Sequence, residues 1–335
     1  MVHNKQGIDM LHGRIWTKVL RFALPVAATG ILEQLFNASG IMIVGNFSQS
    51  DGTAAVAAVG SNAPVTGLIL NLFIGIALGA NVVIANAIGR GSREAVRNAV
   101  HTSIVTALIG GVIVAIIGEL LAGPLLGMLN VTADVFPLAL AYLRIYLIGM
   151  PVILLYNFET AIFRSIGDTQ APLAVLAISG VLNVTMGLIF VVLFHWGVSG
   201  VATATVIANV VSSMILLYRL VHTDAAIHVD LREFGIDWFT LRQILRIGLP
   251  AGVQSAVFAV ANIIIQAAIN SLGTVVMAAS SAALPGRADA AEAATAGVTA
   301  TPSVKTAAKN SERMRLAFIC KTSCLQNFRQ SWRIS

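Results

Sequence analysis

The sequence predicts an all-α polytopic membrane protein, with a six-helix N-lobe followed by the first helix of a second lobe. Long apolar blocks, basic residues confined to alternate loops and a motif repeated across six spans predict this class. Of the 335 residues, 57% are hydrophobic and 11% are charged, whereas a soluble domain carries about 25% charged residues. The apolar residues fall in blocks that reach the roughly 20 residues needed to cross a bilayer. A large soluble core is therefore excluded.

Seven segments are predicted to span the bilayer. Their ranges are 19–45, 56–88, 99–122, 136–163, 172–194, 198–221 and 244–270. The second is long for one crossing, so it is expected to tilt or to extend past the bilayer. Membrane helices tolerate proline where neighbours satisfy the freed carbonyl group. Prolines inside or at the edge of these spans are Pro25, Pro64, Pro151 and Pro250.

Lysine and arginine are confined to one set of alternate loops. The loops on the other side, 45–52, 123–134, 195–200 and 270–273, contain neither residue. Because short cytoplasmic loops carry the excess of positive charge, this pattern predicts a multi-pass inner-membrane protein with a cytoplasmic N-terminus. It also accounts for the formal charge of +6 without a nucleic-acid partner. The basic residues of these loops and of the adjoining span ends are Lys5, Arg14, Lys18, Arg21, Arg90, Arg93, Arg97, Arg164, Arg219, Arg232, Arg242 and Arg246.

Two segments are predicted to lie outside the spans. Residues 1–18 are interpreted as a cytoplasmic amphipathic segment before a retained first span, because the apolar block that follows is too long for a signal peptide. Residues 222–243 are interpreted as a cytoplasmic linker between the lobe 19–221 and the segment 244–283. The linker mixes both charge signs and ends in an aromatic pair. A segment lying on the membrane surface and a solvated loop remain equally open for it.

Neither disulfide nor metal chemistry is expected. The two cysteines, Cys320 and Cys324, lie in the last 16 residues, and the six histidines form no HExxH pair. Such a pattern offers no disulfide framework and no metal-binding spacing.

A short motif repeats across the chain. RFALP at 21–25 recurs as RIGLP at 246–250, an offset of 225 residues that also places Asn37 on Asn262. Small residues and turns follow both copies. Transporters are often built from two homologous halves whose interface holds the substrate. Six spans separate the copies, so the complete unit is predicted to have twelve.

The second copy stops near residue 284. The eighth span has only begun at 275–283, and 284–335 carries 8 of the 21 Lys+Arg residues without an apolar run of spanning length. We interpret 284–335 as a non-homologous, disordered tail that results from truncation or frameshift. A genuine cytosolic tail is the alternative.

Four segments resemble the multidrug and toxic-compound extrusion (MATE) family, from about residue 14 to residue 283. They are LRFALPVAATGILEQLFNASGIMIVGNF, AAVAAVGSNAPVTGLILNLFIGIALGANVVIANAIGRG, NFETAIFRSIGDTQAPL and GVSGVATATVIANVVS. The resemblance implies part of a twelve-helix transporter with two six-helix lobes. It implies export of cationic or amphipathic drugs and toxic compounds by alternating access, as an antiport with Na⁺ or H⁺ and without a further cofactor.

Carboxylates inside the spans are the first candidates for binding the coupling cation, because a buried charge in a membrane is costly and usually functional. Glu33 lies in mid-span with Asn37 at i+4 on the same helix face. A purely structural hydrogen bond is the alternative for Glu33. Glu159 is also a candidate for the cation site. A structural ion pair with Arg164, or exposure at the membrane interface, is the favoured interpretation for it. The other candidates for cation or substrate binding are Asn183, Gln254 and Asn262.

Glu119 and Arg144 are charged residues near the outer ends of their spans. Glu119 is expected to be solvated. Arg144 is expected to extend towards the interface or to balance one of the acids in the lobe.

At the positions where the resemblance implies acidic residues, this sequence has no acid. The family's first-helix aspartate falls on Gly40, and the aspartate one turn after Asn183 falls on Gly187. The glutamate eight residues after the seventh-span proline falls on Phe258. Glu33 occupies the repeat-equivalent of the Phe258 position, so it ranks first.

Four functions compete at this point. Efflux antiport leads, with the bilayer and small cationic or amphipathic substrates as partners. A flippase for lipid-linked precursors needs several basic residues in the spans, which offer only Arg144. An enzyme is not expected, because no paired carboxylates or nucleophile–base pattern occurs. An inactive fragment is the remaining alternative, and activity then requires a second copy or a separate C-lobe.

Overall fold

The computed structural model describes residues 15–48, 52–223, 227–229 and 235–271, all of which belong to one compact unit, Met1–Ala282. The side chains of residues 15–21, Phe258, Ala261, Asn262, Ala268 and Ile269 lie outside the described part. The predictions for the first fourteen residues and for the tail 284–335 also fall outside it.

All of the regular secondary structure in the described residues is helical. Their bounds are α1 (Ile15–Phe47), α2 (Gly52–Gly89), α3 (Arg93–Met128), α4 (Phe136–Ile148), α5 (Met150–Ser165), α6 (Gln170–Leu188), the π-helical turn η1 (Ile189–Leu193), α7 (Gly197–Val221) and α8 (Trp238–Asn270). Five of these helices are long and apolar enough to cross a membrane, and α4 with α5 makes a sixth if the bent pair is one span. The first six predicted spans are therefore confirmed as helices of spanning length. The predicted seventh span is helical within α8.

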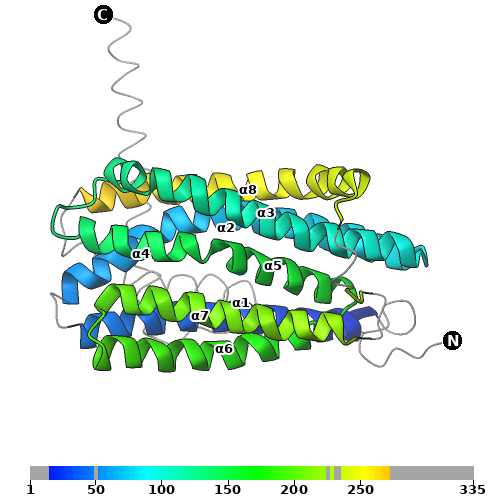
Figure 1. Ribbon diagram of the computed structural model, residues 1–335, viewed down its shortest axis with the longest axis horizontal. Coiled ribbons are helices and arrows are strands. Elements are labelled where there is room, and N and C mark those ends of the chain that lie inside the picture. The colour runs from blue at the N-terminus through cyan, green and yellow to red at the C-terminus, as the bar shows by residue number, and fades with distance from the viewer. Residues whose placement is uncertain (1–14, 49–51, 224–226, 230–234, 272–335) are drawn as a thin grey trace, which may run out of the picture. The chain divides into compact units, whose positions relative to one another are not determined.

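The helices pack in an order that places α8 at one side. Figure 1 shows α8 beside α2 and α3, and α1, α6 and α7 grouped together, with α4 and α5 between the two groups. Helix α2 contacts both α1 and α8, whereas no contact joins α1 to α8 among the described residues. The two helices that carry the repeated motif therefore lie against the same helix without meeting.

The fourth span is broken, which the sequence analysis did not predict. Helices α4 and α5 meet at Gly149 with a bend of 54°. Pro151 lies in the first turn of α5, where its missing N–H group cannot continue the hydrogen bonds of α4. The amides of Val152 and Ile153 instead turn to the Gly149 carbonyl, each at 3.1 Å. A Cβ atom on Gly111 of α3 would lie 2.4 Å from Pro151 Cα, so α3 packs directly against the break.

Four glycines form a seam between α2 and α8. A Cβ atom on Gly75 would lie 2.2 Å from Gly252 Cα, and one on Gly79 would lie 2.4 Å from the Ile244 carbonyl oxygen. A Cβ atom on Gly248 would lie 2.6 Å from Ile76 Cα. Glycines four residues apart let two membrane helices approach until their backbones touch. Backbone contact along this glycine seam fixes the position of α8 on α2.

Buried amide side chains join helices at three further places. Asn62 of α2 donates to the Ala139 carbonyl oxygen at 2.9 Å, and Asn81 of α2 donates to the Ala161 carbonyl oxygen at 2.9 Å. At the far end of α8, Asn270 donates to the Leu129 carbonyl oxygen, which follows α3, at 2.9 Å. In a bilayer such groups have no water to bond, so they are satisfied between helices. These bonds set the register of α2 against α4 and α5, and of α8 against α3.

The linker before α8 packs against the bundle. Ile227 and Val229 are fully buried, and the Val229 amide donates to the Leu220 carbonyl oxygen at 3.2 Å. Helix α8 begins at Trp238, before the predicted linker boundary at 243, because Asp237 caps its first turn. Ile227 and Val229 of the linker are thus packed against the bundle, while the linker bounds and its place on the membrane surface stay predictions.

Asp237 ties the start of α8 to α3. Its carboxylate accepts hydrogen bonds from the Phe239 amide at 3.2 Å and the Thr240 amide at 3.3 Å, and from the Thr240 hydroxyl. Its own amide donates to the Thr102 hydroxyl of α3 at 3.1 Å. The Thr240 hydroxyl, with the two amides, holds the pKa of Asp237 below its usual value.

We expect Asp237→Ala to weaken the first turn of α8 by about 1 kcal/mol at pH 7, which is typical of a lost N-cap. Because the folded-state pKa is depressed, the cap stabilises the helix above the unfolded pKa of about 3.9 and is lost as the pH falls through the folded value. Amide hydrogen exchange of residues 239–242 measures the effect. Asp237→Asn keeps the cap and serves as the control. Equal exchange in wild type and the alanine variant at pH 7 would contradict the prediction.

Candidate functional site

Helix α1 has three different faces. One packs against α6 and α7 through Phe36, Gly40 and Ile43. A second carries large exposed apolar side chains, as expected of a lipid-facing helix: Leu24, Ile31, Leu35 and Met42. The third is polar and carries Glu33, Gln34 and Asn37, of which the first and last are exposed. The structure therefore confirms that Glu33 and Asn37 share a face, and it places that face away from the lipid-facing stripe.

Two tyrosines lie within electrostatic range of the Glu33 carboxylate. They are Tyr146 of α4 and Tyr156 of α5, one on each side of the break at Gly149. Tyr146 also stacks on Tyr142, with ring centroids 6.1 Å apart and planes 12° apart. A carboxylate can bind a small cation directly, and tyrosine rings attract organic cations through their π faces. Helix α1 contacts neither α4 nor α5 in the described structure, so this interaction is a long-range one, and we take Glu33 with these tyrosines as the candidate cation site.

The tyrosines were not among the site residues predicted from the sequence, although a signal for them was present. Three of the four tyrosines of the chain fall in the fourth span. Buried tyrosine usually finds a polar partner for its hydroxyl group, so clustering in one span indicated a polar interior there.

The glycines that replace the expected family acids are closed off by apolar side chains. A Cβ atom on Gly40 would lie 3.2 Å from Val201 Cγ1, and one on Gly187 would lie 3.5 Å from Ile43 Cδ1. Half-buried Asn183 lies between Gly180 and Gly187, on the face of α6 that packs against α1. These positions face apolar side chains and carry no carboxylate, so the acids of the N-lobe cation site implied by the resemblance are absent here.

Glu159 of α5 is fully buried, so the expected interfacial exposure is wrong. Its Oε1 atom accepts a hydrogen bond from the Ser213 hydroxyl of α7 at 3.1 Å, rather than pairing with Arg164. Its Oε2 atom has no hydrogen-bond partner within the described part of the chain. A buried carboxylate with a vacant oxygen is costly to hold as an anion. Glu159 is therefore a second place where a proton or cation can be held.

The candidates on α8 are not brought to this site. Gln254 is exposed on α8, on a different helix face from the glycine seam, and α8 does not contact α1 in the described structure. The side chain of Asn262 lies outside the described residues. The site therefore belongs to the N-lobe alone.

The two charged residues near the outer ends of the third and fourth spans, Glu119 and Arg144, pair with each other. Arg144 Nε lies 3.0 Å from Glu119 Oε1, and both side chains are partly exposed, at 53% and 39%. This confirms that Arg144 balances an acid of the lobe. The expected solvation of Glu119 holds in part, because 39% of its side chain is exposed while its Oε1 atom pairs with Arg144.

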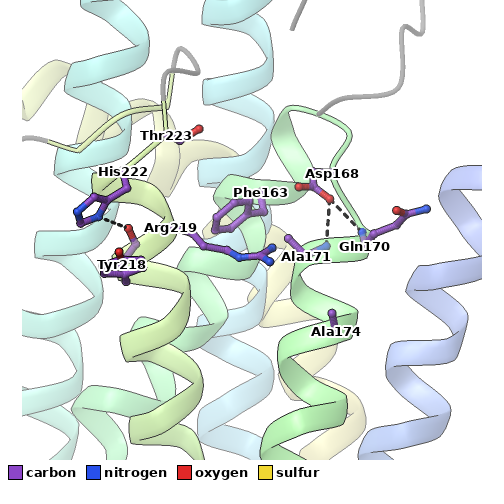
Figure 2. Close-up of a pocket in the computed structure, with 9 residues that line it drawn as sticks. All are labelled: Phe163, Asp168, Gln170, Ala171, Ala174, Tyr218, Arg219, His222 and Thr223. Atoms are coloured by element: carbon purple, nitrogen blue, oxygen red, sulfur yellow. Dashed lines mark hydrogen bonds between the residues drawn. The ribbon is translucent and has the colours of Figure 1, made fainter. Parts of the chain in front are cut away.

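A pocket of about 550 Å³ lies where α5 ends and α6 begins. Figure 2 shows Asp168 accepting hydrogen bonds from the Gln170 and Ala171 amides, at 3.1 and 3.0 Å, which caps α6. His222 Nδ1 lies 2.9 Å from the Tyr218 carbonyl oxygen at the end of α7. These polar contacts serve helix ends, so this pocket is assigned no transport role.

Comparison with known proteins agrees with these features. The MatE family profile matches residues 25–189. The chain is 25% identical over 272 residues to the probable multidrug resistance protein YpnP of Bacillus subtilis, covering 80% of this chain and 59% of the relative. It is 27% identical over 267 residues to the probable multidrug resistance protein YoeA of the same organism, covering 78% and 57%. The chain thus spans under two thirds of these curated relatives.

The fold has a similar counterpart among solved structures. A multidrug resistance MATE family transporter of the MOP superfamily, in an inward-facing conformation, matches with a TM-score of 0.69 and 26% identity, over 83% of this chain and 64% of that one. The match agrees with the expectation of a transporter fold rather than an enzyme. In its sequence match over residues 25–189 and in its helix packing, the chain is similar to the MATE family of multi-pass membrane transporters.

Proposed function

We propose that the protein exports cationic or amphipathic compounds in exchange for Na⁺ or H⁺, with Glu33 as the residue that binds the coupling cation. The observation that carries this proposal is the position of Glu33, an exposed carboxylate in mid-helix on the polar face of α1, one turn from Asn37. Curated relatives described as multidrug resistance proteins support the class of substrate.

The exchange follows from competition for one negative charge. A Na⁺ ion or a proton on Glu33 neutralises the carboxylate, and an organic cation that stacks on the tyrosine rings requires the same charge. Binding of one then favours release of the other. Alternating access to the two sides of the membrane turns this competition into antiport.

The orientation of the chain is part of the proposal. Arg90 follows α2, Arg164 lies in the last turn of α5 and Arg219 in the last turn of α7. The positive-inside rule places these ends, and the N-terminus, on the cytoplasmic side. The proposed location is the inner membrane, and the proposed partners are the bilayer, small cationic substrates and a second lobe from another polypeptide or a second copy.

A flippase function is disfavoured by the pairing of Arg144. This residue was the one span arginine available for a pyrophosphate group in the sequence, and its guanidinium group is engaged by Glu119. A lipid-linked precursor would have to break that ion pair. The efflux proposal requires no such rearrangement.

Ethidium efflux tests the proposal. The chain alone, and residues 1–283 joined to the second lobe of a MATE relative, are expressed in a strain without efflux pumps. We expect the joined protein to lower ethidium accumulation and to depend on a Na⁺ or proton gradient, and the chain alone to do so only when a second lobe is supplied in trans. Absence of export by every combination at normal membrane expression would overturn the proposal.

A further inference from the structure

A cleft of about 660 Å³ lies where α2 ends and where α3 and α8 begin. Two elements of the first lobe and the first helix of the second therefore share its walls. Its lining includes two arginines and two carboxylates: Arg90, Arg246, Glu94 and Asp237. This cleft plays no part in the proposed exchange at Glu33.

The arginines in the cleft are available for a ligand. Arg90 and Arg246 are both exposed, and neither has an ion pair among the described residues. Guanidinium groups bind phosphate through paired, charge-assisted hydrogen bonds. Basic pockets between transmembrane helices commonly hold lipid head groups.

The carboxylates in the same cleft restrict the ligand further. Glu94 is exposed in the first turn of α3. Asp237 caps α8, yet an ionised carboxylate has about four acceptor positions, so it can receive a further hydrogen bond. The four charges sum to zero, which gives a purely anionic ligand no net attraction. A ligand with a phosphate and a primary ammonium group matches both pairs.

One wall of the cleft is apolar and lies at the end of the bundle. Phe239 and Ile247 line it, with 71% and 40% of their surfaces exposed. Trp238, next to the cleft, is 76% exposed. Aromatic side chains gather at the level of lipid head groups, where one edge meets hydrocarbon and the other meets water. The cleft therefore lies at the depth of the phospholipid head groups.

We propose that this cleft binds the head group of phosphatidylethanolamine. The phosphate lies between Arg90 and Arg246, and the ammonium group donates to Glu94 and Asp237. Because Arg246 and Asp237 belong to α8 and its cap while Arg90 and Glu94 belong to the first lobe, the bound lipid joins the two repeats at the membrane surface.

Native mass spectrometry of the purified full chain tests the proposal, with phosphatidylethanolamine, phosphatidylglycerol and phosphatidylcholine added at equal concentration. We expect phosphatidylethanolamine to be retained above both others. Phosphatidylglycerol lacks the ammonium group, and the quaternary ammonium of phosphatidylcholine has no N–H to donate. The Arg90→Ala/Arg246→Ala protein is expected to lose at least about tenfold in affinity, because the charge-assisted hydrogen bonds from both arginines to the phosphate are removed.

Two matched variants test the contribution of the arginine pair and that of the carboxylate separately. Arg219→Ala removes an exposed arginine at the same end of the bundle but outside the cleft, and it should leave lipid retention unchanged. Glu94→Gln should reduce the preference for phosphatidylethanolamine over phosphatidylglycerol. The proposal is overturned if the wild-type protein holds phosphatidylglycerol or phosphatidylcholine as tightly as phosphatidylethanolamine, a comparison that needs no variant. It is also overturned if loss of Arg219 has the same effect as loss of the arginine pair.

Discussion

Glu33→Gln is expected to reduce cation-dependent export by at least about tenfold, in a protein that is otherwise active. The change removes the negative charge and keeps the size of the side chain. The attraction of a carboxylate for a cation is worth about 4 kcal/mol at 4 Å in a medium of intermediate dielectric constant, and tenfold corresponds to about 1.4 kcal/mol. Because Glu33 is exposed on its helix, the thermal unfolding midpoint should change little.

Ethidium efflux from proteoliposomes with an imposed Na⁺ or proton gradient measures this result. Glu119→Gln is the matched control, because it neutralises another partly exposed carboxylate, one that pairs with Arg144. Glu159→Gln forms a second arm, since its buried carboxylate is the other place where a cation can be held. Unchanged export by Glu33→Gln would remove Glu33 from the coupling site. Loss of coupling in Glu159→Gln alone would assign the role to Glu159.

Gly79→Ala is expected to destabilise the docking of α8 on α2 by about 3 kcal/mol, the upper part of the range for overpacking. The new Cβ atom would lie 2.4 Å from the Ile244 carbonyl oxygen and 2.7 Å from the Gly248 amide nitrogen. Both are backbone atoms, so no side-chain rotation relieves the clash, and α8 must move away along the whole seam. Gly252→Ala should have a similar effect, because its Cβ atom would lie 2.4 Å from the Leu72 carbonyl oxygen.

Thermal unfolding in detergent, together with hydrogen exchange of α8, measures the loss. Gly89→Ala and Gly123→Ala are the controls, since a Cβ atom at either position meets nothing within 4 Å. Equal unfolding midpoints for Gly79→Ala and Gly89→Ala would show that the seam does not hold α8.

The span pattern could be predicted because it depends on local composition. Apolar blocks and loop charges are properties of neighbouring residues, so the first six spans and the helical nature of the seventh follow from the sequence. The break at Gly149 could not be predicted in this way, because a proline inside a span does not by itself mark a break. Pro25, Pro64 and Pro250 lie inside unbroken helices, whereas Pro151 lies in the first turn after a break, where α3 packs through Gly111.

The candidate site was only partly predictable for a related reason. The shared face of Glu33 and Asn37 follows from helix periodicity. The tyrosines of the candidate site come from the fourth span, more than a hundred residues away in the chain, and spacing alone does not show which spans lie near one another. Glu159 was misjudged because its distance from the span end suggested exposure, whereas Ser213 of α7 covers it.

The glycine seam also bears on the order in which a protein of this family is assembled during synthesis. Helix α8 emerges from the ribosome after the first lobe, and it can dock on α2 through backbone contacts that involve no later residue. In the longer relatives, the equivalent helix would then be docked on the first lobe before the rest of the second lobe is inserted, and the later helices would pack against it. Mutations in the seam would in that case lower the yield of membrane-inserted protein, even at positions far from any transported molecule.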